Sequence, residues 1–154
     1  MKYPFIPKSN KSLTAGDYWI IKLENGNYAV GLVVDIPEIK TKLRMEFIAG
    51  LLDYSNSKKP ELEDLLNARI VKQGKTHVKT IGYTGKEIVG NINLESNGIE
   101  PLIQRSQIGF QPDAWIVRGY RRVRNMKRDD VEKYSVLGGW GFDMIKIFAE
   151  ENKN

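Results

Sequence analysis

GDYWIIKLENGNYAVGLVVD, residues 16–35, is the stretch that decides the fold. Two runs rich in β-branched and aromatic residues, 17–23 and 28–34, flank the dipeptide Asn25-Gly26. Asn-Gly readily supplies the positive φ that both central positions of a type I′ turn require. The stretch therefore predicts an antiparallel β-hairpin with a two-residue loop.

A two-residue loop fixes the register of this hairpin, because it pairs Leu23 with Tyr28 and Trp19 with Leu32. One face is then wholly apolar, and we expect it to form core. Its residues are Trp19, Ile21, Leu23, Tyr28, Val30 and Leu32. The opposite face is only partly apolar, and Gly31 on it predicts a bulge or the close approach of another backbone.

Further short elements follow along the chain. Residues 42–48 alternate apolar and charged side chains, which is typical of a strand with one wet face. Pro60 precedes acidic residues and leucines at helical spacing, which predicts a short helix over 60–68. We also expect a helix over 142–151. The other predicted strands are 70–72, 76–82, 99–103, 114–123 and 134–137.

This pattern predicts a mainly β (α+β) fold, either a curved antiparallel sheet or a small SH3-like barrel with one or two short helices. We expect residues 1–154 to form a single domain, with 1–11 as an extended arm and 152–154 as a frayed tail. The absence of cysteine excludes disulfides and thiolate metal sites. No signal peptide or long apolar run is present, so we expect a cytoplasmic protein.

The net charge of +5 is concentrated in one segment. Residues 114–128 carry six basic residues and no acid, whereas the remaining chain has 18 bases and 19 acids. A cluster of one sign indicates a partner rather than general solubility. Arginine interleaved with Trp115 and Tyr120 is typical of protein hot spots and of single-strand nucleic-acid sites. A solvated strand face that leads into a basic loop is the structural alternative.

Signals for catalysis are weak. His77 is the only histidine and has no nucleophile motif around it, so we expect a structural or surface role. The run 82–86 lacks the residue spacing of a phosphate-binding loop, so we interpret it as a turn. The acids of 61–64 are accounted for by a helix dipole, and Asp129-Asp130 by a solvated loop. We therefore predict no catalytic residues, no cofactor and no metal.

The hairpin also carries a family resemblance. Its Gly16-Asp17 pair, the turn Gly26-Asn27-Tyr28 and the strand 31–34 resemble the opening of the immunity protein 26 family of bacterial polymorphic-toxin systems. Residues 79–82 are similar to a later family strand that ends in Ile-Gly, although that strand usually has Trp where this chain has His77 or Val78. The resemblance implies a small, non-enzymatic β protein that binds and neutralises one cognate toxin domain.

We thus expect an immunity protein that contacts its toxin through the basic stretch and the tryptophan of the glycine-rich connector 138–141. The expected partner-binding residues are Trp115, Arg118, Tyr120, Arg121, Arg122, Arg124 and Trp140. The alternative is a small β-barrel module that binds nucleic acid through residues 118–128. A hydrolase that uses His77 is the third class. We expect no membrane partner.

Overall fold

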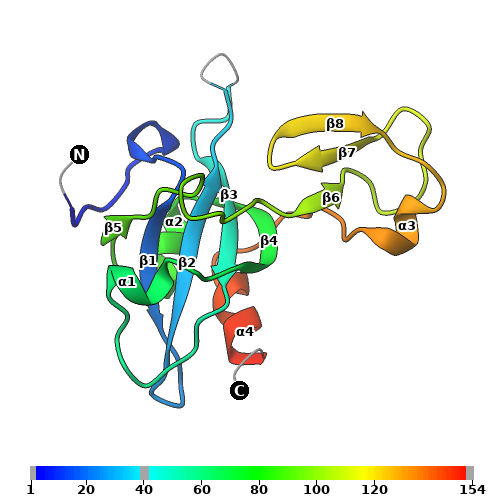
Figure 1. The fold of residues 1–154 in the computed structure, drawn as a ribbon. Helices are drawn as coiled ribbons and strands as arrows, with labels where there is room; N and C mark the ends of the chain where they lie inside the picture. The colour runs from blue at the N-terminus through cyan, green and yellow to red at the C-terminus, as the bar shows by residue number, and fades with distance from the viewer. Residues whose placement is uncertain (1–2, 39–41, 152–154) are drawn as a thin grey trace.

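The computed structural model describes residues 3–38 and 42–151, which form two antiparallel sheets (Figure 1). The larger sheet has the strand order β4-β3-β2-β1-β5, and the smaller one has the order β6-β7-β8. The strands of the larger sheet are β1 (Asp17–Lys22), β2 (Tyr28–Asp35), β3 (Glu46–Leu52), β4 (Ile70–His77) and β5 (Gly90–Asn91). Those of the smaller sheet are β6 (Ile103–Arg105), β7 (Trp115–Arg118) and β8 (Arg121–Asn125).

Four short α-helices accompany the sheets in the described part of the chain, where one or two were expected. They are α1 (Leu62–Leu65), α2 (Lys79–Thr84), α3 (Asp130–Lys133) and α4 (Met144–Glu151), and a 3-10 turn spans Asn10–Ser12. The predicted mainly β fold with a curved antiparallel sheet is confirmed. The five-stranded sheet ends at β4 and β5 and does not close into a barrel.

The opening hairpin forms as predicted, but its predicted register is wrong by one residue. The N–H of Leu23 donates to the carbonyl of Asn27 at 2.8 Å, so the loop has three residues, Glu24 to Gly26. Gly26 alone in this loop has a positive φ, +87°. A loop of three residues with glycine last is the next favoured hairpin connection after the two-residue turns.

This shift exchanges partners across the hairpin. Trp19 lies opposite Gly31 rather than Leu32, and Ile21 lies opposite Ala29 rather than Val30. The indole of Trp19 covers Gly31 so closely that a Cβ on Gly31 would collide with the ring. Gly31 therefore marks a close approach, as expected, but the approaching group is a side chain and not a backbone.

Both faces of the larger sheet are buried, which explains why apolar content alone did not decide the register. Trp19, Ile21 and Phe47 pack on one face in a cluster that includes residues of α2 and α4. Val30 and Leu32 pack on the other face with Leu65 of α1. The face of β1 that carries Tyr18, predicted to be half covered, thus belongs to a second core, and Tyr28, Val30 and Leu32 lie on that face rather than on the face of Trp19.

Several element boundaries differ from those predicted. Strand β3 begins at Glu46, so residues 42–45 precede it. The segments predicted as two strands, 70–72 and 76–82, instead form one continuous strand, β4, followed by helix α2. Helix α1 covers the middle of the predicted 60–68, and α4 covers most of 142–151. The expected edge strand at 99–103 begins only at Ile103.

The N-terminal arm is held against the body. Phe5 pairs with Ile88 through two backbone hydrogen bonds of 3.0 and 2.8 Å. The expected frayed tail at 152–154 lies outside the described residues. None of the helices in the described ranges has the length and apolar character needed to cross a membrane.

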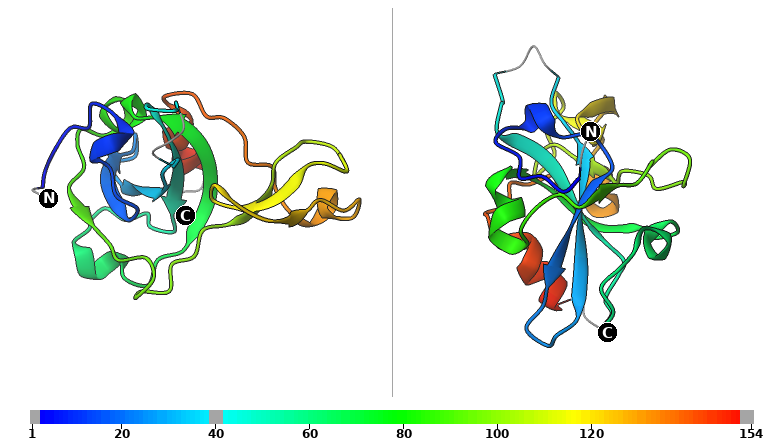
Figure 2. Two further views of the ribbon diagram at one scale, coloured as in Figure 1. Left: turned by 90° about the horizontal axis from the view of Figure 1, so that it is seen from above. Right: turned by 90° about the vertical axis from the view of Figure 1, so that its left-hand side faces the viewer.

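Strands β6, β7 and β8 extend away from the larger sheet, as the views from the front and from above both show (Figures 1 and 2). We call these three strands the projecting sheet. The single strand predicted over 114–123 is in fact a hairpin of β7 and β8, which turns at Gly119-Tyr120. The predicted strand at 134–137 is reduced to one parallel bridge between Arg105 and Val136.

Candidate partner-binding surface on the projecting sheet

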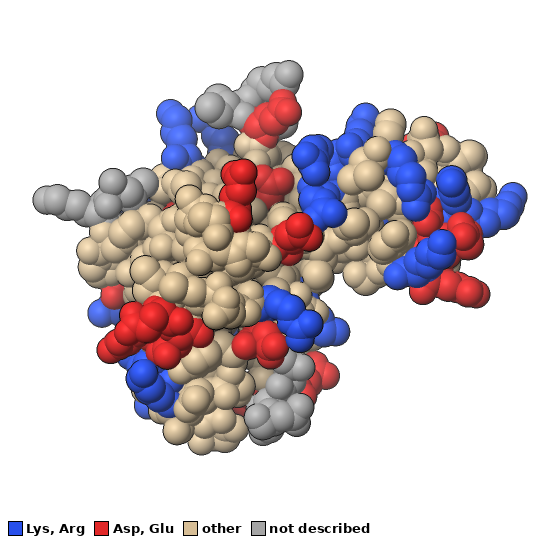
Figure 3. All heavy atoms as spheres, in the orientation of Figure 1, with Lys and Arg blue, Asp and Glu red and all other residues tan. Residues whose placement is uncertain are grey.

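The β7–β8 turn places the basic stretch at an exposed edge. Gly119 occupies the first loop position with a φ of +62°, which a type II′ hairpin turn requires. Strand β8 then runs along the outside of the projecting sheet, and four of its five residues are exposed. Lys and Arg side chains gather over this part of the surface (Figure 3).

Tyr120 connects the β7–β8 turn to the larger sheet through two hydrogen bonds. Its N–H donates to Oδ2 of Asp35 at 2.8 Å, and its hydroxyl donates to Oε2 of Glu46 at 2.6 Å. Burial and these two acids raise the pKa of Tyr120 well above its ordinary value of 10. Tyr120, expected to contact a partner, therefore has a structural role that fixes the position of the arginines beside it.

A second attachment joins the two sheets through buried amides. The Nε2 of Gln73 donates to Oε1 of Gln104 at 3.0 Å, and the Nε2 of Gln104 donates to the carbonyl of Gln73 at 3.0 Å. The Oε1 of Gln73 also accepts the N–H of Leu102 at 2.9 Å. Both glutamine side chains are buried. Buried polar groups that are fully hydrogen-bonded fix a unique arrangement, so the projecting sheet has a defined orientation.

Arg124 forms an ion pair that joins strand β8 to helix α3. Its guanidinium donates two hydrogen bonds, of 2.7 and 2.8 Å, to the carboxylate of Asp130. Asp130 is fully buried and also accepts the N–H of Lys127 at 2.7 Å. The guanidinium of Arg124 is the main reason that the pKa of Asp130 lies far below its ordinary value. The expectation of a solvated Asp129-Asp130 loop is therefore wrong for Asp130.

Two other arginines cover aromatic rings. The guanidinium of Arg122 lies 4.8 Å from the ring centre of Trp115, and that of Arg128 lies 4.5 Å from the ring centre of Phe110. Cation–π stacking holds such side chains in place without removing their charge. Phe110 was not among the expected site residues, and Arg128 was expected only as part of the stretch 118–128 proposed for nucleic acid. An aromatic residue shortly before the basic stretch is the only sequence signal for Phe110.

Arg118 makes weaker contacts. It lies 3.6 Å from Glu100, whose side chain is 79% exposed, and donates to the carbonyl of Pro101 at 3.4 Å. An exposed pair of this kind contributes little to stability. Within residues 3–38 and 42–151, the side chains of Arg121 and Lys127 make no ion pair and no cation–π contact. These two cations are free to bind an acidic group.

Trp140 does not join this surface. Its indole lies over Gly74 of β4 and packs against Phe148 of α4, with ring centres 5.3 Å apart. The expected set therefore divides into three parts. Trp115, Arg118, Arg121, Arg122 and Arg124 lie on the projecting sheet, Tyr120 forms its attachment, and Trp140 lies on the larger sheet.

The other sequence candidates have local roles. The Nδ1 of His77 accepts the N–H of Lys79 at 3.0 Å, and its ring packs edge-on against Phe142. The run 82–86 includes the end of α2, where Gly85 donates to the carbonyl of Ile81 at 3.0 Å. No group of three or more potential metal ligands occurs among the described residues.

Comparison of the chain with protein families, curated proteins and solved structures gives no match.

Proposed function

We propose that the chain is a non-enzymatic binding protein that uses the projecting sheet to contact an acidic surface of one partner protein. The observation that carries this proposal is the exposed strand β8, which presents Arg121 and Arg122 from a sheet fixed at two places to the body. A rigid surface loses little conformational entropy on binding, which favours affinity. Its arginines would supply electrostatic complementarity and a fast association rate.

The partner that we propose is a cognate toxin domain, which the chain neutralises in the cytoplasm of the producing cell. This part of the proposal rests on the resemblance of residues 16–34 to the immunity protein 26 family. No cofactor is needed, because inhibition requires only that the toxin surface be covered. A basic inhibitor surface favours toxins whose exposed surface is acidic or mixed.

Co-expression with the toxin encoded immediately upstream tests this proposal. We expect rescue of growth and recovery of a complex. The double change Arg121→Glu with Lys127→Glu should slow association by about tenfold or more at low salt, because both side chains are free to meet the partner. The same charge change at Lys8 and Lys11, which are exposed on the N-terminal arm, is the matched control. Absence of rescue and of a complex would refute the proposal.

A nucleic-acid-binding module is the second candidate, favoured by the free cations at Arg121 and Lys127 and by the aromatic ring of Trp115 on the projecting sheet. One face of that ring is already covered by Arg122, which weakens the case for base stacking. A mobility shift with a single-stranded oligonucleotide tests this function. Binding at about 50 mM salt that is lost in Arg121→Glu would support it, and no shift under those conditions would exclude it.

A further inference from the structure

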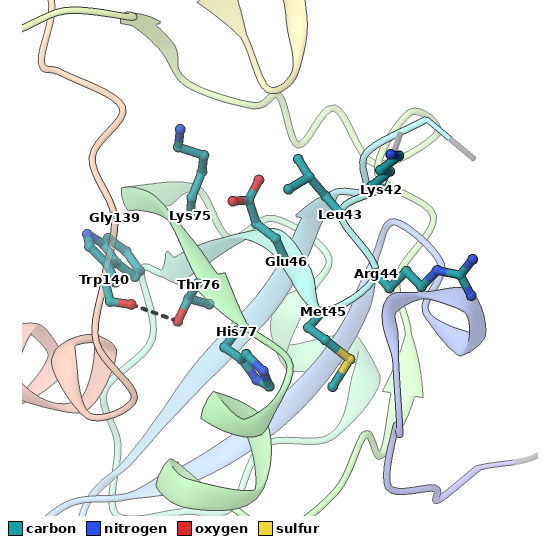
Figure 4. A pocket seen from close by; sticks show the side chains of 10 residues that line it. All are labelled: Lys42, Leu43, Arg44, Met45, Glu46, Lys75, Thr76, His77, Gly139 and Trp140. Carbon is teal, nitrogen blue, oxygen red and sulfur yellow. Dashed lines mark hydrogen bonds between the residues drawn. The ribbon is translucent and has the colours of Figure 1, made fainter. Parts of the chain in front are cut away.

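A groove lies on the larger sheet, and its described lining includes no residue of β8 (Figure 4). Its volume is about 630 Å³, and it is open to solvent. One wall consists of Trp140 and Thr76, and the other of Glu46 and Met45, with Lys75 at one end and His77 at the other. The volume is within the range of ligand sites, but an open groove suits an extended chain better than a small molecule that needs enclosure.

Both walls are fixed by hydrogen bonds. Asn10 holds the rim, because its side-chain amide donates to the carbonyls of Leu43 and Glu46 at 2.7 and 2.8 Å. On the other wall, the N–H of Trp140 donates to the carbonyl of Lys75 at 2.6 Å, and Oγ1 of Thr76 donates to the carbonyl of Trp140 at 3.2 Å. The groove is thus pre-organised, which reduces the entropy lost when a ligand binds.

Exposed apolar side chains continue the groove beyond His77. The ring centre of His77 lies 5.5 Å from that of Phe142, and the ring centre of Phe142 lies 6.0 Å from that of Tyr83. Phe142 is 41% exposed, Tyr83 68% and Leu43, on the groove rim, 49%. Side chains on one face of an extended peptide recur about every 6.6 Å, which is close to these ring spacings.

The charges at the end of the groove favour an anion. Lys75 and Lys42 lie near this end and make no ion pair within the described residues. Glu46 adds one negative charge to the lining, and its Oε2 already accepts the hydroxyl of Tyr120, so the two lysines outnumber this single acid. Arg44 is directed away from the groove and contributes little to it.

From these features we propose that the groove and the rings of Phe142 and Tyr83 bind an extended peptide segment. An acidic side chain of the segment pairs with Lys75. Apolar side chains that follow at alternate positions cover Met45, then Phe142 and Tyr83. The ligand class is a short acidic-apolar segment of a protein chain, and the site is separate from the surface proposed for the toxin.

Selection from a random twelve-residue peptide library displayed on phage tests this site. We expect enriched peptides that carry an acid followed by apolar residues at alternate positions. The affinity of a synthetic copy should fall about tenfold or more in Lys75→Glu, where an attraction becomes a repulsion, and similarly in Phe142→Ser.

Matched controls lie outside the groove. Lys22→Glu changes an exposed charge on strand β1 of the same sheet, and Ile108→Ser removes an exposed apolar side chain from the loop between β6 and β7; neither should alter affinity. Failure to enrich any peptide would overturn the proposal. So would peptides without an acid, or peptides whose affinity falls in Arg121→Glu and not in Lys75→Glu, because the latter would bind the projecting sheet.

Discussion

The hydroxyl of Tyr120 donates a 2.6 Å hydrogen bond to Glu46, and this bond joins the turn of the projecting sheet to the first residue of β3. Tyr120→Phe removes the donor and keeps the ring. We expect a loss of about 1 kcal/mol in the free energy of unfolding, because the carboxylate loses one partner. Urea unfolding measures it, and Tyr83→Phe, at an exposed ring, is the control that should change nothing.

The effect of Tyr120→Phe also depends on pH. The pKa of Tyr120 is raised in the folded state by burial and by Glu46, so its contribution is complete below the unfolded pKa of about 10. Above that pH the unfolded chain loses the proton while the folded chain keeps it, and the wild type loses stability. The difference between wild type and variant should therefore narrow from pH 9 to pH 11. A constant difference would contradict this assignment.

Gln104→Ala should loosen the projecting sheet while leaving the larger sheet intact. The change leaves the buried carbonyl of Gln73 without its donor, at a cost of about 1–3 kcal/mol. We expect faster amide hydrogen exchange in β6 to β8 and unchanged exchange in β1 to β3, because only the attachment is lost. Gln107→Ala, at an exposed position, is the control. Equal acceleration in both sheets would mean that they unfold as one unit.

The pair of Arg124 and Asp130 predicts an acid-sensitive projecting sheet. Because the pKa of Asp130 is lowered in the folded state, its contribution is complete above the unfolded pKa of about 3.9 and is lost as the pH falls. Asp130→Asn should therefore destabilise the protein at pH 7, and this difference should shrink by pH 3. Melting temperatures at the two pH values measure it. Asp129→Asn removes only an exposed pair with Lys133 and should have little effect at either pH.

The sequence predicted the hairpin and the mainly β class because turn residues and apolar strands are local signals. Its register could not be predicted, since both faces of β2 are buried and either alignment covers the apolar side chains. The contact that decides it, Trp19 over Gly31, is a packing relationship that no residue pattern encodes.

The candidate partner-binding surface was predicted only in part, because local patterns identify some of its residues but not their long-range contacts. Charge clustering located the arginines, and Gly119 between two strand-like runs was a turn signal that could have divided the predicted strand. Contacts between residues far apart in the chain had no comparable signal in the sequence. The bond from Tyr120 to Glu46 spans 74 positions, and Trp140 has its partners on the larger sheet, so neither role follows from the neighbouring sequence.

Gly31→Ala tests the contact that decides the register. A methyl group on residue 31 would collide with the indole of Trp19, which is fully buried and also donates from Nε1 to Oγ1 of Thr84 at 3.0 Å. The ring cannot move away without breaking that bond, so we expect a loss of about 1–3 kcal/mol in the free energy of unfolding. Gly82→Ala is the matched control, because a methyl group added at Gly82 would meet no atom within 4 Å apart from its chain neighbours and the backbone of its own helix. It lies within α2, where alanine should raise stability by about 0.5–1 kcal/mol. Urea unfolding of the two variants should therefore shift in opposite directions, and equal shifts would contradict the packing of Trp19 on Gly31.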